Sequence, residues 1–175
     1  MATEMLIISK NGLIKKTSLE EFGNVRRTGI IPFSLKKNDQ LKWVRLSSGN
    51  DEVILTTVQG QAIRFKESQV RSMGRTAAGV IAIREKNSDT VASMDIIVKD
   101  LKSARLLVIM ERGYGKQTPL LQYKVQSRGG SGMKTAKITT KTGPLVGAQI
   151  VAEETELFVI SVKGQIINTE INDVR

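Results

Sequence analysis

The chain has 175 residues, 40% of them apolar, and contains no cysteine and no histidine. These two absences exclude disulfides, Cys/His zinc sites, thiol nucleophiles and Ser-His-Asp catalysis. The 27 Lys and Arg residues exceed the 17 Asp and Glu residues, and the net charge of +10 favours a polyanionic partner such as nucleic acid. Because the cations are spread along the whole chain, we expect a basic folded surface and no basic tail.

The N-terminal region carries no targeting pattern. Lys10 follows the apolar run 6–8, whereas a signal peptide places its cations before its apolar run. No apolar run approaches the roughly 20 residues that a membrane helix needs. Together with the lack of cysteine, this predicts a cytoplasmic protein with no membrane partner.

A hairpin pattern occurs four times along the chain. Each copy has an apolar run, a polar turn with glycine and a second extended run, which is typical of a β-hairpin. The copies are EMLIISKNGLIKKTSL (4–19), DEVILTTVQGQAIRFKES (51–68), ARLLVIMERGYGKQTPL (104–120) and TELFVISVKGQIINTEI (155–171). Their turn glycines, Gly12, Gly60, Gly113 and Gly164, are 48, 53 and 51 residues apart.

A second block follows each of the first three hairpins, and it reads as two further strands. The blocks are TGIIPFSLKKNDQLKWVRL, AGVIAIREKNSDTVASMDI and SGMKTAKITTKTGPLVGAQIV. One unit therefore has about four strands, and the repeats are 4–50, 51–103 and 104–154, with a half repeat at 155–175, in a single domain 4–175. No stretch has a convincing helical period. The pattern predicts an all-β, propeller-like array of blades. A β-sandwich is the alternative, but it does not require the same loop in every unit.

The connectors between hairpin and second block repeat an arginine and a glycine. They read NVRRTG, MGRTAAG and QSRGGSG and end at Gly29, Gly79 and Gly132. Each has an arginine three or four residues earlier; these arginines are Arg26, Arg75 and Arg128, with Arg27 additional in the first connector. Arginine beside exposed main-chain N–H groups suits phosphate oxygens. In the alternative, each glycine only shapes a crossing between blades and each arginine is a solvated charge. The repetition in register favours phosphate binding.

Further cations accompany the hairpins and connectors. These candidates are Lys15, Lys16, Arg64, Lys66 and Lys116 in the hairpins, and Arg71 and Lys134 beside the connectors. On blades arranged in an arc they would form a curved basic track, and a duplex that follows such a track must bend. Aromatic residues are few, whereas a single-strand binder usually offers more stacking surfaces. Duplex DNA is therefore the expected ligand.

Several stretches resemble the C-terminal domain of the A subunit of bacterial DNA gyrase. They are NGLIKKTSLEEF, NDEVILTTVQGQAIRFKESQVRSMGRTAAGVIAIR and ERGYGKQTPLLQYKVQSRGGSGMKTAKIT, and the resemblance covers about residues 4–175. It implies a β-pinwheel, a propeller-like fold of about six blades in which neighbours exchange strands. It also implies wrapping of duplex DNA with positive handedness along the basic perimeter. In the bacterial nucleoid, this wrapping supports ATP-dependent negative supercoiling by an enzyme of two A and two B subunits.

That family has a seven-residue box, Q-R-R-G-G-[KR]-G. The stretch QSRGGSG matches it at Gln126, Arg128, Gly129, Gly130 and Gly132, and serines replace two basic positions. The resemblance implies a degenerate copy on a later blade, with glycines at the crossing between blades and Arg128 at a phosphate. Since three and a half units are fewer than about six, we expect a fragment of the family domain.

We expect no catalysis from this chain by itself. Its two tyrosines, Tyr114 and Tyr123, lie in no nucleophilic setting, and neither a phosphate-binding loop nor a metal-ligand spacing occurs. The resemblance implies that ATP and magnesium act elsewhere in the holoenzyme, so no cofactor is expected here.

Expected partners are duplex DNA, the gyrase B subunit, and the breakage-reunion domain of the gyrase A subunit. The alternatives are the C-terminal domain of the A-type subunit of topoisomerase IV and a protein-interaction propeller that does not bind DNA.

Overall fold

The computed structural model describes residues 2–25, 27–84, 88–98, 103–152, 154 and 156–174. The first repeat contributes β1 (Glu4–Ser9), β2 (Leu13–Ser18), η1 (Leu19–Phe22) and β3 (Leu41–Ser47). The second contributes β4 (Glu52–Thr57), β5 (Gln61–Lys66), η2 (Glu67–Gln69), β6 (Val80–Ile81) and β7 (Val91–Ile97). The third contributes β8 (Arg105–Met110), β9 (Gly115–Pro119), η3 (Leu120–Gln122), β10 (Met133–Lys134) and β11 (Leu145–Val151). The last segment contributes β12 (Glu156–Ile160), β13 (Ile166–Glu170) and η4 (Ile171–Asp173).

The strands form four antiparallel sheets that exchange strands between repeats. Their orders are β3-β1-β2-β6, β10-β5-β4-β7, β11-β8-β9 and β12-β13. Strand β6 comes from the second repeat but pairs with β2 of the first, and β10 comes from the third repeat but pairs with β5 of the second. Each of these repeats thus adds a strand to the sheet before it. The predicted all-β pinwheel fold is confirmed, and the described helical segments are short 3-10 turns.

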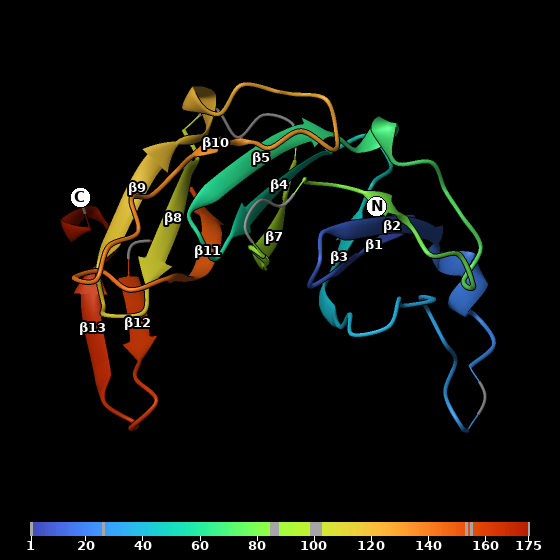
Figure 1. Cartoon of the computed structure of the whole chain (residues 1–175), viewed down its shortest axis with the longest axis horizontal. Coiled ribbons are helices and arrows are strands. Elements are labelled where there is room, and N and C mark those ends of the chain that lie inside the picture. Colours follow the sequence, from blue (N-terminus) through green and yellow to red (C-terminus); the bar gives the residue numbers. More distant parts are fainter. Residues whose placement is uncertain are drawn as a thin grey trace.

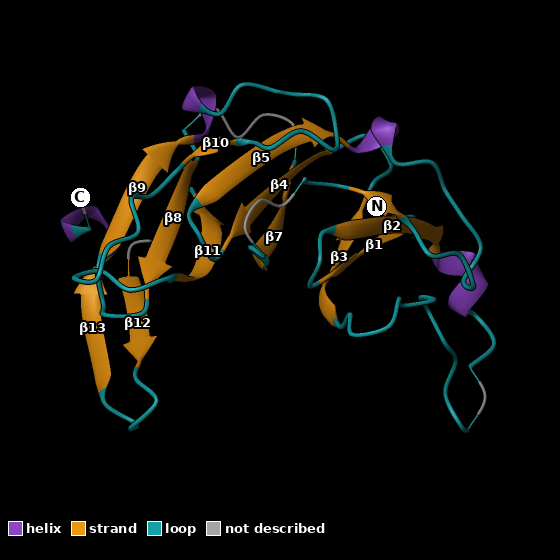
Figure 2. Cartoon of the chain, viewed as in Figure 1, coloured by secondary structure: helices purple, strands orange, loops and turns teal. Residues whose placement is uncertain are grey.

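The sheets stand side by side and form an arch (Figure 1). Strands β7 and β11 lie on its inner side, and β5 and β10 lie on its outer side. The four 3-10 turns also lie along the outer side (Figure 2). The first sheet is at one end of the arch, and the hairpin β12–β13 is at the other.

Neighbouring sheets are held together by apolar side chains on the faces that they turn to each other. Between the first two sheets, Leu6, Ile8 and Ile14 pack in one cluster with Val53, Leu55 and Met94 of the second repeat. A second cluster joins Ile54 and Ala62 to Leu106 and Val108 of the third repeat. Because strand residues alternate between the two faces of a sheet, each repeat has a forward face toward the next repeat and a backward face toward the previous one.

Candidate nucleic-acid interface

The connector glycines lie directly against the sheet of the preceding repeat. A Cβ atom on Gly79 would lie 2.6 Å from the carbonyl oxygen of Ile14, and one on Gly132 would lie 2.4 Å from that of Ala62. Both glycines also have positive φ, +74° and +71°. Only glycine fits such a crossing, because a side chain would collide with the main chain of the neighbouring strand.

The stretch QSRGGSG makes main-chain hydrogen bonds to the second repeat. The N–H of Gln126 donates to the carbonyl of Arg64 (2.7 Å), and the N–H of Gly129 donates to that of Ala82 (2.8 Å). The carbonyl of Gly130 accepts from the N–H of Arg84 (2.8 Å). Two N–H groups that could donate to a phosphate, those of Gln126 and Gly129, already donate to carbonyls of the second repeat, and the stretch QSRGGSG forms a crossing between blades.

In the second and third connectors, the described arginines Arg75 and Arg128 contact the preceding 3-10 turn. Arg128 donates from Nε to the carbonyl of Gln69 (3.2 Å) and from Nη1 to that of Ile81 (2.5 Å). Arg75 makes the equivalent contact one repeat earlier, with its Nε 3.8 Å from a carboxylate oxygen of Glu21. Both side chains are half-buried. These two arginines therefore lie at contacts between neighbouring repeats. Arg26, the corresponding arginine of the first connector, falls outside the described residues.

Lys15 is buried, so its predicted position on the basic surface is wrong. Its Nζ donates to the carbonyls of Pro32 (2.7 Å) and Arg75, and it lies 5.7 Å from the centre of the Phe33 ring. Burial lowers the pKa of Lys15 below its ordinary value, while the charge of Glu21 partly opposes the shift. This lysine fastens two connectors to the first sheet.

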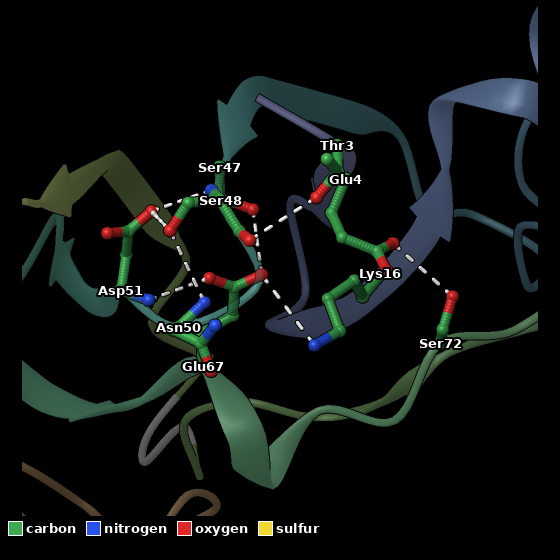
Figure 3. A network of polar contacts seen from close by, with 9 residues as sticks. All are labelled: Thr3, Glu4, Lys16, Ser47, Ser48, Asn50, Asp51, Glu67 and Ser72. Atoms are coloured by element: carbon green, nitrogen blue, oxygen red, sulfur yellow. Dashed lines mark hydrogen bonds and ion pairs between the residues drawn. The ribbon is translucent and has the colours of Figure 1, made fainter. Parts of the chain in front are cut away.

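Lys16 is also buried, and its predicted surface position is wrong for the same reason. Its Nζ lies 3.7 Å from the carboxylate of Glu67, as Figure 3 shows. That carboxylate also accepts from the hydroxyl of Ser47 (2.7 Å) and from the N–H of Asp51 (3.1 Å). The carboxylate of Asp51 in turn accepts from the N–H and the hydroxyl of Ser48. The network joins the first repeat to the second.

Arg64 has a similar structural role at the contact between the second and third repeats. Its guanidinium forms an ion pair with Glu52 (2.6 Å) and donates to the carbonyls of Leu120 (2.9 Å) and Tyr123 (3.3 Å) in the next repeat. Gln117 occupies the equivalent position on β9, and its amide donates to the carbonyls of Ile171 (2.5 Å) and Val174 (2.8 Å). Arg64 and Gln117, which occupy the same position of successive repeats, thus hold the 3-10 turn of the following repeat.

Five of the predicted cations remain exposed: Arg27, Lys66, Arg71, Lys116 and Lys134. Sequence reasoning missed another exposed cation, Lys124, which occupies the same position in the third repeat as Arg71 does in the second. Each of these two residues lies four positions after the first residue of its 3-10 turn, so the repeat spacing itself could have found Lys124. Sequence reasoning also missed Arg84 and Lys137. Both are exposed, and each lies three positions after an exchanged strand, β6 for Arg84 and β10 for Lys137.

Figure 2 places η2 and η3 on the outer side of the arch, and the exposed cations Arg71 and Lys124 follow these turns two residues later in the chain. This side therefore presents cations at equivalent positions of two successive repeats, about one blade apart. Such an arrangement suits a polyanion that crosses the blades one after another.

In the described part of the chain, no cluster of three or more acidic side chains could hold a metal ion. No helix there is long and apolar enough to cross a membrane.

Known proteins are similar to this chain in sequence and in architecture. The family described as "DNA gyrase C-terminal domain, beta-propeller" matches at residues 3–48, 51–97, 105–152 and 155–175. The chain is 38% identical over 170 residues to the DNA gyrase A subunit of Staphylococcus epidermidis, covering 97% of the chain and 19% of that protein. It is 40% identical over 168 residues to the DNA gyrase A subunit of Haloquadratum walsbyi, covering 96% and 20%. The chain thus spans about a fifth of the length of these relatives.

Two solved structures superpose on nearly the whole chain. The C-terminal domain of DNA topoisomerase IV matches with a TM-score of 0.91 and 26% identity over all of this chain and 54% of that one. A DNA gyrase A C-terminal domain matches with a TM-score of 0.86 and 24% identity over 98% of this chain and 56% of that one. On the combined sequence and fold, the chain belongs to the DNA gyrase C-terminal domain, β-propeller family.

Proposed function

We propose that this chain binds duplex DNA along the outer side of the arch and bends or wraps it, as part of a gyrase A subunit. The observation that carries the proposal is the repetition of exposed cations beside the 3-10 turns of successive repeats, Arg71 after η2 and Lys124 after η3. Contacts with phosphates alone would make binding nearly independent of sequence, except where the DNA must deform.

In this proposal the chain supports supercoiling without a chemical step of its own. Its partners are DNA and the rest of the gyrase holoenzyme, in which ATP, magnesium and the breakage-reunion domain perform the reaction in the bacterial cytoplasm. The second candidate is the same role in the A-type subunit of topoisomerase IV, which the TM-score of 0.91 to that enzyme's C-terminal domain favours. Gyrase A remains the first choice because the sequence relatives with 38% and 40% identity carry that name.

The test is DNA affinity as a function of salt, measured by fluorescence anisotropy with a labelled duplex. We expect affinity to fall linearly with salt on logarithmic axes, because each phosphate contact releases counterions. The double variant Arg71→Ala/Lys124→Ala should bind less tightly and flatten the slope by about two. The matched control is Lys37→Ala/Lys163→Ala, which removes the same charge from exposed positions away from the 3-10 turns. No binding, or equal loss in both variants, would contradict the proposed surface.

Bending is tested separately with relaxed circular DNA. The chain is added together with a nicking-closing topoisomerase, the protein is removed, and the topoisomers are resolved on a gel. A shift toward positive supercoils that grows with protein concentration is the expected result for wrapping in the gyrase sense. Salt-sensitive binding without any shift would limit the proposal to DNA binding. Neither binding nor shift would favour a protein-interaction propeller.

A further inference from the structure

The contacts between successive sheets are alike in their main chain but differ in their side chains on the inner side of the arch. Strands β3, β7 and β11 occupy the same edge of their sheets, and Figure 1 shows this edge on the inner side. We call these three the inner strands. We call the contact between the first and second sheets the first joint, and that between the second and third sheets the second joint.

The exchanged strands fix the opposite edge of both joints in the same way. The N–H of Ala82, directly after β6, donates to the carbonyl of Gly12 (2.8 Å). The N–H of Thr135, directly after β10, donates to the carbonyl of Gly60 (2.9 Å). The crossing glycines beside these bonds leave no room even for a Cβ atom. At this edge, therefore, both joints are closed by equivalent main-chain contacts.

The inner strands also begin with equivalent main-chain contacts. The N–H of Val91 donates to the carbonyl of Lys10 (2.9 Å), and the N–H of Leu145 donates to that of Val58 (3.0 Å). Beyond these first residues, the inner strands run in separate sheets and do not pair with one another. The side chains between them therefore decide how far apart they lie.

In the first joint, two large side chains of β3 stand between the inner strands. The indole of Trp43 donates to the carbonyl of Ala92 (2.8 Å) and packs on the apolar cluster between the first two sheets. The guanidinium carbon of Arg45 lies 5.3 Å from the centre of the Trp43 ring, as in a cation–π contact. Nε of Arg45 lies 3.5 Å from a carboxylate oxygen of Asp95. A stacked indole and guanidinium thus separate β3 from β7.

In the second joint, the same two positions carry small side chains. They are Ser93 and Asp95 of β7, because β7 pairs with β4 in the register in which β3 pairs with β1. The hydroxyl of Ser93 donates to the carbonyl of Ala148 (2.6 Å), and the carboxylate of Asp95 accepts from the N–H of Ile150 (2.9 Å). A longer stretch of β7 lies close to β11 than to β3. Short side chains thus accompany the closer pair of inner strands.

We propose that these side chains are spacers that set the angle between successive sheets. Trp43 and Arg45 hold the first joint more open on the inner side than Ser93 and Asp95 hold the second. Because the opposite edge is fixed and a packed joint leaves no slack, a larger spacer turns the two sheets less sharply toward each other. Asp95 belongs to both joints, since its carboxylate contacts Arg45 as well as the N–H of Ile150.

For a bound duplex, this inference rests on the proposed function. The residues that directly follow Arg71 and Lys124 form bridges to Lys16 of the first sheet and Arg64 of the second. The two exposed cations therefore lie beside successive sheets, one on each side of the first joint. The spacers of that joint set how sharply a duplex turns between the two cations, so they are positioning residues for DNA bending.

The angle is measured on the chain alone, from the distance between two spin labels in pulsed electron paramagnetic resonance. Because the chain contains no cysteine, labels attach only at introduced sites. Leu46→Cys with Val98→Cys reports the first joint, and Val98→Cys with Ala152→Cys reports the second. All three residues are exposed and lie at or directly after the ends of inner strands.

Exchanging the spacers between the joints should shift these distances in opposite directions. Trp43→Ser copies the second joint and should shorten the label distance across the first joint while leaving the other unchanged. Ser93→Trp copies the first joint and should lengthen the label distance across the second. Trp43→Phe keeps an aromatic ring without the indole donor, so it is the control for the lost hydrogen bond and should leave both distances unchanged.

Circular dichroism spectra show which variants fold. If Trp43→Ser does not fold, Trp43→Val, with a side chain of intermediate volume, should shift the distance in the same direction. Folded spacer variants whose label distances equal those of the unmodified spacers would overturn the inference, because water or neighbouring side chains would then fill the space without moving the sheets.

A duplex with a donor and an acceptor dye at its two ends extends the test to DNA. At saturating protein, Trp43→Ser should raise the energy transfer, because a sharper arch brings the ends of the duplex closer together. Its affinity should equal that of the unmodified chain, since Trp43 lies on the inner side, away from Arg71 and Lys124. Shifted label distances with unchanged energy transfer would support the spacers but contradict a DNA path along the outer side. Unshifted label distances would overturn the spacers even if duplex DNA binds.

Discussion

Nη1 of Arg128 donates a hydrogen bond of 2.5 Å to the carbonyl of Ile81, a residue of the strand that the second repeat adds to the first sheet. Nε of the same guanidinium donates to the carbonyl of Gln69, at the end of the second 3-10 turn. One side chain of the third repeat therefore holds the place where the first and second repeats exchange a strand. This geometry gives the repeated connector arginines a structural role beside any contact with phosphate.

We predict that Arg128→Ala lowers the free energy of unfolding by about 1 to 2 kcal/mol, because two carbonyls lose a charged donor at a half-buried joint. Urea denaturation followed by tryptophan fluorescence, which reports Trp43, measures the change. Lys124→Ala is the control, and we expect its effect to stay within about 0.5 kcal/mol, as for an exposed residue. If Arg128→Ala reduced DNA affinity without changing stability, phosphate contact would be its main role.

Gly132 and Gly29 form a matched pair for testing the crossing between blades. Both have positive φ, but only Gly132 lies against a neighbouring main chain. Gly29→Ala should cost about 1 kcal/mol for the backbone conformation alone. Gly132→Ala should cost at least about 2 kcal/mol, because the new methyl group must also displace the strand that contains Ala62. Thermal unfolding of the two variants compares these costs, and equal shifts in melting temperature would show that close packing contributes nothing.

The buried pair Lys16 and Glu67 is expected to be strongly coupled. Glu67→Leu introduces an aliphatic side chain, as at the equivalent positions Leu120 and Ile171, but it leaves the ammonium of Lys16 buried without its carboxylate. We expect a loss of about 3 kcal/mol or more in the free energy of unfolding. Adding Lys16→Gln, which copies Gln117, should recover a large part of that loss.

A double-mutant cycle from urea denaturation measures this coupling energy. Additive effects of the two substitutions would mean that the pair does not stabilise the joint as a unit. The hydrogen bonds of Glu67 to Ser47 and Asp51 predict that recovery stays incomplete, since the double variant still lacks their acceptor.

Lys15 predicts a pH dependence of stability. Its pKa in the folded chain lies below the ordinary value of 10.5 because burial disfavours the charged form. Between the folded pKa and 10.5 the unfolded chain therefore binds more protons, and its unfolding free energy rises with pH. Relative to the Lys15→Met variant, the unmodified chain should gain stability as pH increases through that window. Denaturant midpoints of both proteins measured from pH 7 to about 10 test the sign, and a constant difference would contradict the desolvation of Lys15.

Local sequence patterns were enough to identify the four hairpins and the strand that ends each second block. The other strand predicted in each block has no counterpart among the described strands of the first repeat, and it is only two residues long in the second and third. The alternation of apolar residues and the glycine turns are properties of each hairpin by itself, so they predict strands wherever the hairpin finally packs. The exchange of strands was implied only by family resemblance, because β6 and β10 are two residues long and carry no hairpin turn. Their pairing depends on the next repeat being placed beside the acceptor strand.

Lys15 and Lys116 show what only the tertiary structure decided. They occupy the same position of their repeats, and the sequence treats both as surface cations. Lys15 is covered by Phe33 and held by two carbonyls, whereas Lys116 is exposed. Periodicity determines the repeat position of a side chain, but its solvent exposure depends on which distant segments pack over that position. The sequence by itself therefore determined the repeats, the all-β fold and the positive charge, and the packing between repeats decided which cations can face a partner.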